Sequence, residues 1–437
     1  MIHQTLRDWQ SRKNRKPLLL WGARQVGKTY SLREFGRTCF PRHHIINFEE
    51  RPSAATIFAG DLTPDRILRE ASLFLDTPID SRNDLLVFDE IQACPRALTS
   101  LKYFAENMPD MAVCAAGSLL GVHLAECSFP VGKVDEVHMY PMTFAEFLMN
   151  AGNSLLFEAF TSISELAPIS ETLHARLWDA FKTYLVTGGL PEVVLTFYRE
   201  QANPFSAFQH VRDVQNRLVT DYVADMAKHC GKQNAMHIER LWGNIPAQLG
   251  RDQNGAAPKF VFKDVLPGIR GYERMTGVID WLEAAGLILR LPIVNSGQLP
   301  FPAYEKENFF KLFIFDIGIL GALGRLPARN ILSYGYGTYK GFFAENFVAQ
   351  EFQTRRRENL ACWREGRAEV EFITEVDGQV IPIEVKSGWV TQAKSLNVFA
   401  DKYHPPFSAV FSARNPAIES RRRKHYYPLY LAAKFPL

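Results

Sequence analysis

Short apolar runs alternate with polar or amphipathic stretches over the first 150 residues. Each run has the length of a buried strand, and each intervening stretch is long enough to form a helix between two strands. This alternation predicts an α/β fold in which helices cover both faces of a parallel sheet. The predicted strands span residues 18–21, 44–48, 85–89, 112–116 and 134–140.

The pattern then changes twice. Residues 155–230 lose the strand signals and carry apolar side chains such as Leu177 and Phe181 at helical spacing, until a Gly-Gly-Leu-Pro break at 188–191. From about residue 235 to 293 the order becomes helix, short strand, helix and strand. That order is typical of a small winged-helix module.

Strand and helix signals mix again from about residue 311. Apolar runs at 313–315, 369–374 and 380–385 predict strands around a helix at 341–352, which indicates a separate α/β domain. We therefore expect four parts: an α/β domain at 1–150, a helical connector at 151–232, a winged-helix-like module at 233–300 and a second α/β domain at 301–437.

Composition adds few constraints on function. The 437 residues are 47% apolar and 22% charged, which is typical of a folded globular chain, and the net charge of +3 neither requires nor excludes a nucleic-acid partner. The six cysteines form no C-x-x-C pair, which argues against a zinc site and fits a reducing cytosol. The longest apolar run, residues 111–125, is too short to span a bilayer, and no secretory signal is present. We expect a cytoplasmic protein without a membrane partner.

One segment matches a phosphate-binding loop, G-x-x-x-x-G-K-[ST], between a predicted strand and a predicted helix. Its glycines let backbone N–H groups turn toward phosphate oxygens at the start of the helix. Lys28 would meet the β and γ phosphates of ATP, and Thr29 would offer its hydroxyl to Mg²⁺. The predicted nucleotide-binding residues are Gly22, Ala23, Arg24, Gln25, Val26, Gly27, Lys28 and Thr29.

Two acids end the apolar run at 85–88 and complete the predicted ATP site. Asp89 would join the Mg²⁺ shell, and Glu90 would polarise the attacking water, because hydrolysis needs both charge neutralisation and an oriented nucleophile. After the strand at 113–116, Ser118 is either a sensor of the γ-phosphate or part of a simple turn, and both interpretations stay open. Lys28, Glu90 and Ser118 are the predicted catalytic residues.

With these residues assembled, the chain resembles a family of prokaryotic AAA-type ATPases that join an N-terminal P-loop domain to a C-terminal domain of unknown function. The resemblance implies ATP and Mg²⁺ as cofactors and extends over nearly the whole chain. Two positions depart from the family: Lys133 stands where arginine is usual, and Glu371 stands where aspartate is usual. The matching stretches are 21–29 (WGARQVGKT), 88–92 (FDEIQ), 116–118 (AGS), 141–147 (PMTFAEF), 188–192 (GGLPE), 315–318 (FDIG), 345–348 (ENFV), 369–372 (EVEF) and 384–388 (EVKSG).

The C-terminal part also resembles the PD-(D/E)XK fold, the α/β fold of restriction-endonuclease-like proteins. The resemblance implies a metal site in which Glu371 and Glu384 supply oxygen ligands, Glu345 completes the shell from a helix, and Lys386 lies near the nucleophile. The alternative is a degenerate nuclease fold in which Glu384 and Lys386 form an ion pair that holds the sheet. We favour that alternative, because the extra methylene of Glu371 shifts a metal-binding oxygen.

Three functions follow from these patterns. The first is an Mg²⁺-dependent ATPase whose nucleotide state controls the nuclease-like module, and the second is an ATP-driven nuclease that processes DNA. The third is a nucleotide-dependent switch that binds a partner protein without cleaving DNA. The helix expected at 272–285 is too acidic to read a DNA groove, so we interpret the winged-helix part as an internal coupling module. Basic runs at 355–357 and 421–424 and a homo-oligomer are compatible with all three functions.

Overall fold

The protein is described by a computed structural model that covers residues 2–118, 129–249, 259–262, 265–266, 271–334, 339–355, 359–389 and 394–437. The chain divides into two compact units. The first unit comprises Met1–Tyr140 with Ala284–Gly286, and the second comprises Pro141–Glu283 with Leu287–Leu437. The second half of the apolar run at 111–125, and Arg356 and Arg357 of one basic run, lie outside the described residues.

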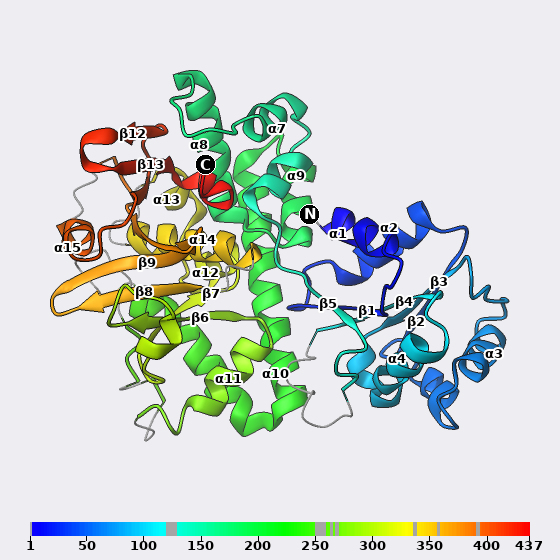
Figure 1. Ribbon diagram of the computed structural model, residues 1–437. Helices are drawn as coiled ribbons and strands as arrows, with labels where there is room; N and C mark the ends of the chain where they lie inside the picture. Colours follow the sequence, from blue (N-terminus) through cyan, green and yellow to red (C-terminus); the bar gives the residue numbers. More distant parts are fainter. Residues whose placement is uncertain are drawn as a thin grey trace. The chain divides into compact units, whose positions relative to one another are not determined.

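The first unit is built on a five-stranded sheet in the order β2-β3-β4-β1-β5, and every neighbouring pair is parallel (Figure 1). The predicted α/β class with an N-terminal parallel sheet is therefore confirmed. The strands are β1 (Leu18–Trp21), β2 (His43–Asn47), β3 (Leu85–Asp89), β4 (Ala112–Gly117) and β5 (Asp135–His138). The helical elements are α1 (Ile2–Gln10), α2 (Lys28–Cys39), η1 (Pro52–Phe58), α3 (Pro64–Phe74), η2 (Ile91–Ala93) and α4 (Pro95–Asn107).

Alternation along the strands gives this sheet two apolar faces. In β1, Leu18 and Leu20 pack with Trp9 and Phe35 of α1 and α2, whereas Leu19 packs into a second core on the opposite face. Each fully buried side chain of this size stabilises the fold by roughly 1.5–3 kcal/mol. Helices on both faces leave the carboxyl edge of the parallel strands as the place where loops gather.

The second unit combines helices with an eight-stranded mixed sheet in the order β12-β13-β11-β10-β9-β8-β6-β7 (Figure 1). The strands are β6 (Ile288–Val294), β7 (Phe310–Ile314), β8 (Leu360–Glu365), β9 (Ala368–Val376), β10 (Gln379–Val385), β11 (Ser408–Ser412), β12 (Ala417–Glu419) and β13 (Lys424–Pro428). The α-helices are α6 (Phe144–Asn150), α7 (Ser154–Thr161), α8 (Glu171–Thr187), α9 (Pro191–Glu200), α10 (Pro204–Leu249), α11 (Thr276–Ala284), α12 (Ile317–Leu323), α13 (Ala328–Leu332), α14 (Tyr339–Thr354) and α15 (Lys394–Tyr403). Short 3₁₀ helices are η4 (Phe301–Tyr304), η5 (Ser420–Arg422) and η6 (Leu429–Lys434).

Within this sheet one continuous stretch of chain runs from α14 through β8, β9 and β10 to α15 and β11. β8, β9 and β10 are antiparallel neighbours, and β11 joins β10 in parallel. A parallel join needs a crossover, and α15 provides it. Of the helices that the structure describes, none has both the length and the apolar character needed to cross a bilayer.

Candidate active site

The predicted phosphate loop connects the end of β1 to the start of α2. Gly22 has a φ of 152°, and a Cβ atom there would lie 2.1 Å from the carbonyl oxygen of Met139. Gly27 caps α2 with a φ of 98°, in the left-handed region. Both positions therefore require glycine. The free N–H groups of the first turn of α2 follow directly, and they favour an anion.

The other loop residues fix the curvature of the loop. Ala23 and Val26 are buried, and Gln25 adopts a left-handed φ of 64°. The Arg24 guanidinium lies 3.3 Å from a carboxylate oxygen of Glu49. The loop is thus shaped by apolar packing and by its own backbone conformations.

Lys28 is buried inside the loop that precedes it. Its Nζ donates hydrogen bonds to the carbonyl oxygens of Gly22 at 3.0 Å and Ala23 at 2.8 Å. Burial lowers the pKa of Lys28 to about 8, although the negative charges of Glu90 and Asp89 oppose this shift. The ammonium group is held by weak neutral acceptors, which phosphate oxygens would displace with a stronger charged contact.

Thr29 and Asp89 meet at the carboxyl edge of the sheet. The Thr29 hydroxyl donates to the Asp89 carboxylate at 2.9 Å, and the side-chain amide of Asn47 donates to the same carboxylate at 2.9 Å. Burial, followed by the charge of Glu90, raises the pKa of Asp89. A hydroxyl and a carboxylate are hard oxygen donors of the kind that Mg²⁺ takes beside substrate phosphates, so these two residues fit that ion.

Glu90 follows Asp89 and leaves the strand with a left-handed backbone, at φ 49° and ψ 48°. Its carboxylate accepts a hydrogen bond of 2.6 Å from the side-chain amide of Gln92. Ser118 directly follows β4, which pairs with both β1 and β3. Its hydroxyl is buried and has no hydrogen-bond partner among the described residues.

The second predicted cluster lies where β9 and β10 are neighbours. Lys386 Nζ is 2.6 Å from a carboxylate oxygen of Glu384 and 3.7 Å from one of Glu371. The backbone N–H of Val385 donates to Glu371 at 3.3 Å. Burial and then Glu371 raise the pKa of Glu384. Burial lowers the pKa of Lys386, but the two acids raise it by more, so its ammonium form is held.

A lysine that the sequence analysis did not select completes this cluster. Lys311 of β7 is fully buried, and its Nζ lies 3.0 Å from a carboxylate oxygen of Glu369 and 3.6 Å from one of Glu345. Burial opposes the charged form of Lys311, yet the surrounding carboxylates, Glu345 foremost, raise its pKa. The available signal was a single lysine within an otherwise apolar strand, which is expensive to bury unless it is paired.

The described residues do not form a metal cage. Among them, no three His, Cys, Asp or Glu side chains gather where they could hold a metal ion. The positive charges beside Glu345, Glu371 and Glu384 are the ammonium groups of Lys311 and Lys386. The four predicted nuclease-site residues thus lie in one charge network with Lys311 and Glu369, in which two lysines face four carboxyl groups.

Two further predicted features have local roles. Lys133, which replaces the arginine of the resembled family, pairs with Glu106 at 3.0 Å. On α11, Asp280 and Glu283 form ion pairs of 3.2 and 2.9 Å with Arg290 of β6. Two of the acids of the expected recognition helix, Asp280 and Glu283, are therefore engaged within the second unit.

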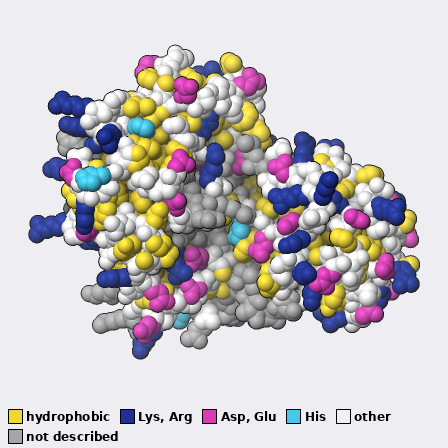
Figure 2. Space-filling view, viewed as in Figure 1, with side chains coloured by type: hydrophobic (Ala, Val, Ile, Leu, Met, Phe, Trp, Pro, Cys, Tyr) yellow, Lys and Arg dark blue, Asp and Glu magenta, His cyan; other side chains and the backbone are white. Residues whose placement is uncertain are grey.

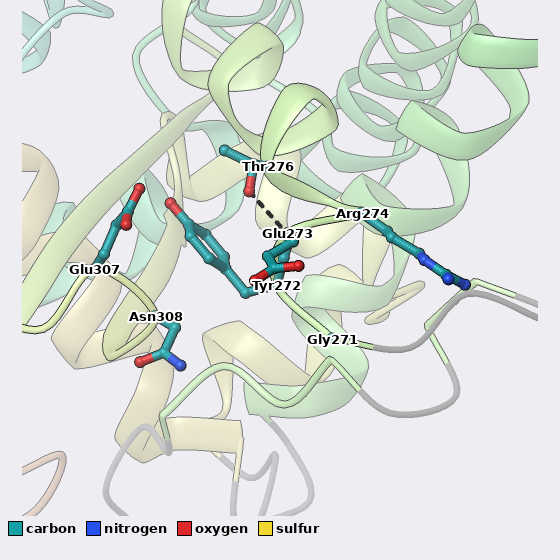
Figure 3. A pocket seen from close by; sticks show the side chains of 7 residues that line it. All are labelled: Gly271, Tyr272, Glu273, Arg274, Thr276, Glu307 and Asn308. Atoms are coloured by element: carbon teal, nitrogen blue, oxygen red, sulfur yellow. Dashed lines mark hydrogen bonds between the residues drawn. The ribbon is translucent and has the colours of Figure 1, made fainter.

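A cavity of about 1030 Å³ lies in the second unit at the start of α11. Figure 3 shows that Glu307 points into the same space as Tyr272, whereas Arg274 points away; the backbone of Tyr272 accepts a hydrogen bond from the Thr276 hydroxyl. The charged groups near the opening are mostly acids, which disfavours a phosphate-bearing ligand. The lining residues are Gly271, Tyr272, Glu273, Arg274, Thr276, Glu307 and Asn308.

The described surface of the first unit carries charges of both signs. On the face that Figure 2 shows, at the right of the view, Lys and Arg side chains are interspersed with Asp and Glu side chains. This face therefore lacks the continuous basic surface that follows a nucleic-acid backbone.

The parallel sheet, the loop and its carboxylates define the class of the first unit as a P-loop domain of the ATPase type. Comparison with known proteins agrees: a family model described as "AAA domain" matches residues 14–148. Two families described as domains of unknown function match residues 179–330 (DUF8612) and 340–431 (DUF4143). A search of curated proteins gave no match.

Solved structures with similar arrangements include a Walker-type ATPase of Pyrococcus abyssi, at 16% identity and a TM-score of 0.46, covering 73% of this chain and 94% of that one. The ORC1 protein of Aeropyrum pernix in complex with DNA matches at 14% identity and a TM-score of 0.32, covering 77% of this chain and 91% of that one. The RuvB Holliday junction branch migration motor of Thermotoga maritima matches at 13% identity and a TM-score of 0.34, covering 67% of this chain and 89% of that one.

Proposed function

We propose that the protein is an Mg²⁺-dependent ATPase that hydrolyses ATP to ADP and phosphate at the carboxyl edge of the first sheet. The observation that carries this proposal is the contact between Thr29 and Asp89 at 2.9 Å, directly beside Lys28 and Glu90. Four side chains from the loop and from β3 are thus arranged for one polyphosphate and one cation.

Each side chain has one task in this reaction. Lys28 exchanges the loop carbonyls for phosphate oxygens, and Thr29 and Asp89 hold the cation. Mg²⁺, when bound, neutralises charge on the β and γ phosphates. Glu90 orients a water molecule and takes its proton, and the Ser118 hydroxyl is available to bond the γ-phosphate.

ATP binding tests the first part of this proposal. Lys28→Ala removes the only side-chain ammonium of the loop, so we expect the affinity for a fluorescent ATP analogue to fall by 100-fold or more, on the order of 3 kcal/mol. Lys16→Ala, on an exposed residue outside the loop, is the matched control and should bind as the wild type does. Equal affinity of the Lys28→Ala protein and the wild type would refute the site.

We further propose that nucleotide state controls the second unit through a buried polar network that begins at residue 141. The backbone N–H of Phe144 donates to Glu351 of α14 at 2.9 Å. The Tyr184 hydroxyl donates to the carbonyl oxygen of Met142 and accepts from Gln350 of α14 at 2.8 Å. The segment that follows the P-loop domain in the chain is thereby hydrogen-bonded to the helix that carries Glu345.

A second group of contacts extends this network to α12. The Asp316 carboxylate accepts from the N–H of Gly189 at 2.7 Å and from the N–H of Ile319 at 3.0 Å. A Cβ atom at position 189 would lie 2.1 Å from the carbonyl oxygen of Met142, so only glycine allows the two segments to approach. The stretches 141–147, 188–192 and 315–318, which carry the family resemblance, therefore meet near the buried Asp316 carboxylate.

The module controlled in this way would be the C-terminal part, whose Glu371, Glu384 and Lys386 resemble the residue pattern of the PD-(D/E)XK fold. We infer that it does not cleave DNA, because Glu371 stands where aspartate is usual and the fully buried Lys311 brings a further ammonium group to the acids. The protein would then act as a nucleotide-dependent switch for a partner protein. Incubation of the wild-type protein with ATP, Mg²⁺ or Mn²⁺ and duplex DNA should leave the DNA intact, and cleavage that Glu384→Gln abolishes would contradict this inference.

A further inference from the structure

Gln92 is a polar side chain beside the ATP site for which the reaction above has no task. It lies in η2, and its Nε2 donates a hydrogen bond of 2.6 Å to Glu90 Oε2. A carboxylate only accepts hydrogen bonds, so this contact fixes the orientation of the amide: Nε2 faces Glu90 and Oε1 faces away from it.

The backbone explains why position 92 lies next to position 90. Glu90 has a left-handed conformation, which few residues other than glycine adopt. Hydrogen bonds from Ala93 N–H to the Glu90 carbonyl at 3.0 Å, and from Cys94 N–H to the Ile91 carbonyl at 2.9 Å, close the turn that follows. This turn brings the amide of Gln92 to the carboxylate of Glu90, a side chain that would otherwise rotate about three bonds.

The carbonyl oxygen of the Gln92 amide makes no comparable contact within the described part of the chain. Gln92 Oε1 is closed off from solvent and has no hydrogen-bond donor among the described residues. Water therefore does not reach this oxygen, and the contact that Gln92 offers to the ATP site is the one that Nε2 makes with Glu90.

We propose that Gln92 is a positioning residue for ATP hydrolysis, which holds the Glu90 carboxylate through Nε2 in the orientation that receives the proton of the attacking water. This inference rests on the proposed function. In the step it serves, the bond from the water oxygen to the γ-phosphorus forms and the bond from the γ-phosphorus to the bridging oxygen breaks. The proton of the water passes to Glu90 and then to solvent, which leaves ADP and phosphate.

Steady-state hydrolysis by Gln92→Met tests this role, because methionine has a similar shape and neither polar atom. We expect kcat to fall between about 10- and 100-fold with KM for ATP unchanged, since a small misplacement of a catalytic group has an effect of this size. Gln92→Glu should give the same loss, because two neighbouring carboxylates repel each other. Gln4→Met is the matched control: Gln4 makes the same kind of amide-to-carboxylate bond, to Asp8 on an exposed face of α1.

A double-mutant comparison separates positioning from a general structural effect. In a Glu90→Gln background, Gln92→Met should cause no further loss of kcat, because there is no carboxylate left to position. A kcat at or above the wild-type value in Gln92→Met, or a rise in KM with kcat unchanged, would overturn the inference alone. Absence of turnover in the wild-type protein would overturn the proposed function and this inference with it.

Discussion

Buried lysines at the two sites differ in what they contact. Lys28 bonds to neutral carbonyl groups of its own loop, whereas Lys311 and Lys386 lie against carboxylates. An incoming phosphate therefore gains a charged partner at Lys28 by displacing weak bonds. At the other two lysines the charge is already compensated, and a new ligand would have to displace an ion pair.

Removal of Lys311 should destabilise the second unit strongly. Lys311→Met preserves volume but leaves Glu345 and Glu369 without their cation, and breaking a buried ion pair on one side costs about 3–5 kcal/mol. Urea unfolding followed by fluorescence measures the change, with Lys306→Met, on an exposed residue, as the control. Adding Glu345→Gln should restore part of the loss, and a Lys311→Met protein as stable as the wild type would contradict the assigned charge network.

At the scale of elements, the carboxyl edge of the first sheet was largely predictable. The loop and the Asp89–Glu90 pair are short, local signals at strand ends, and parallel strands end at one edge. Asn47 was not predictable, because its contact with Asp89 depends on the pairing of β2 with β3, in which these two residues are register partners. Sequence periodicity identifies strands but does not say which strands are neighbours.

In the second unit, too, the important contacts join residues that are far apart in the sequence and could not be predicted from it. Lys311 of β7 meets Glu345 of α14 across 34 positions of sequence, and no spacing rule connects a strand lysine to a helix glutamate. The stretches at 141–147, 188–192 and 315–318 were recognisable only as resemblances. Their physical meaning, close backbone packing around Asp316, follows from tertiary contacts.

The network around α14 should make stability depend on pH. Burial raises the pKa of Glu351 from 4.5 to about 8, with the Phe144 N–H and Arg355 opposing the shift and Glu146 reinforcing it. A raised pKa means that the folded state binds the proton more tightly, so the stabilisation is complete below about pH 4.5 and is lost as the pH rises through about 8.

Glu351→Gln should remove this dependence, because glutamine can accept from the Phe144 N–H and never ionises. Between pH 5 and pH 9 we expect the variant to gain stability relative to the wild type by on the order of 4 kcal/mol, at about 1.4 kcal/mol per pH unit between pH 5 and the folded-state pKa of about 8. The difference between the two unfolding free energies isolates Glu351 from Asp316, which also titrates with a raised pKa, about 6. A difference that stays constant with pH would show that Glu351 is ionised in the folded protein.

At the scale of the whole molecule, the two units divide the chemistry. The first holds the phosphate loop and the strand-end acids, and the second holds the cluster in which Lys311 and Lys386 lie against buried carboxyl groups. The chain leaves the first unit at Tyr140 and enters the buried network of the second at Pro141–Phe144. The residues that follow Tyr140 are thus hydrogen-bonded to α14 within four positions of the unit boundary.

Phosphate release from ATP by the purified protein shows whether the first unit hydrolyses its nucleotide. We expect Mg²⁺-dependent turnover in the wild type, and a loss of about 100-fold or more in Glu90→Gln with ATP still bound, because removing a general base has an effect of this size. Lys28→Ala should show neither turnover nor bound ATP. Turnover in Glu90→Gln at the wild-type rate would exclude Glu90 as the general base of ATP hydrolysis.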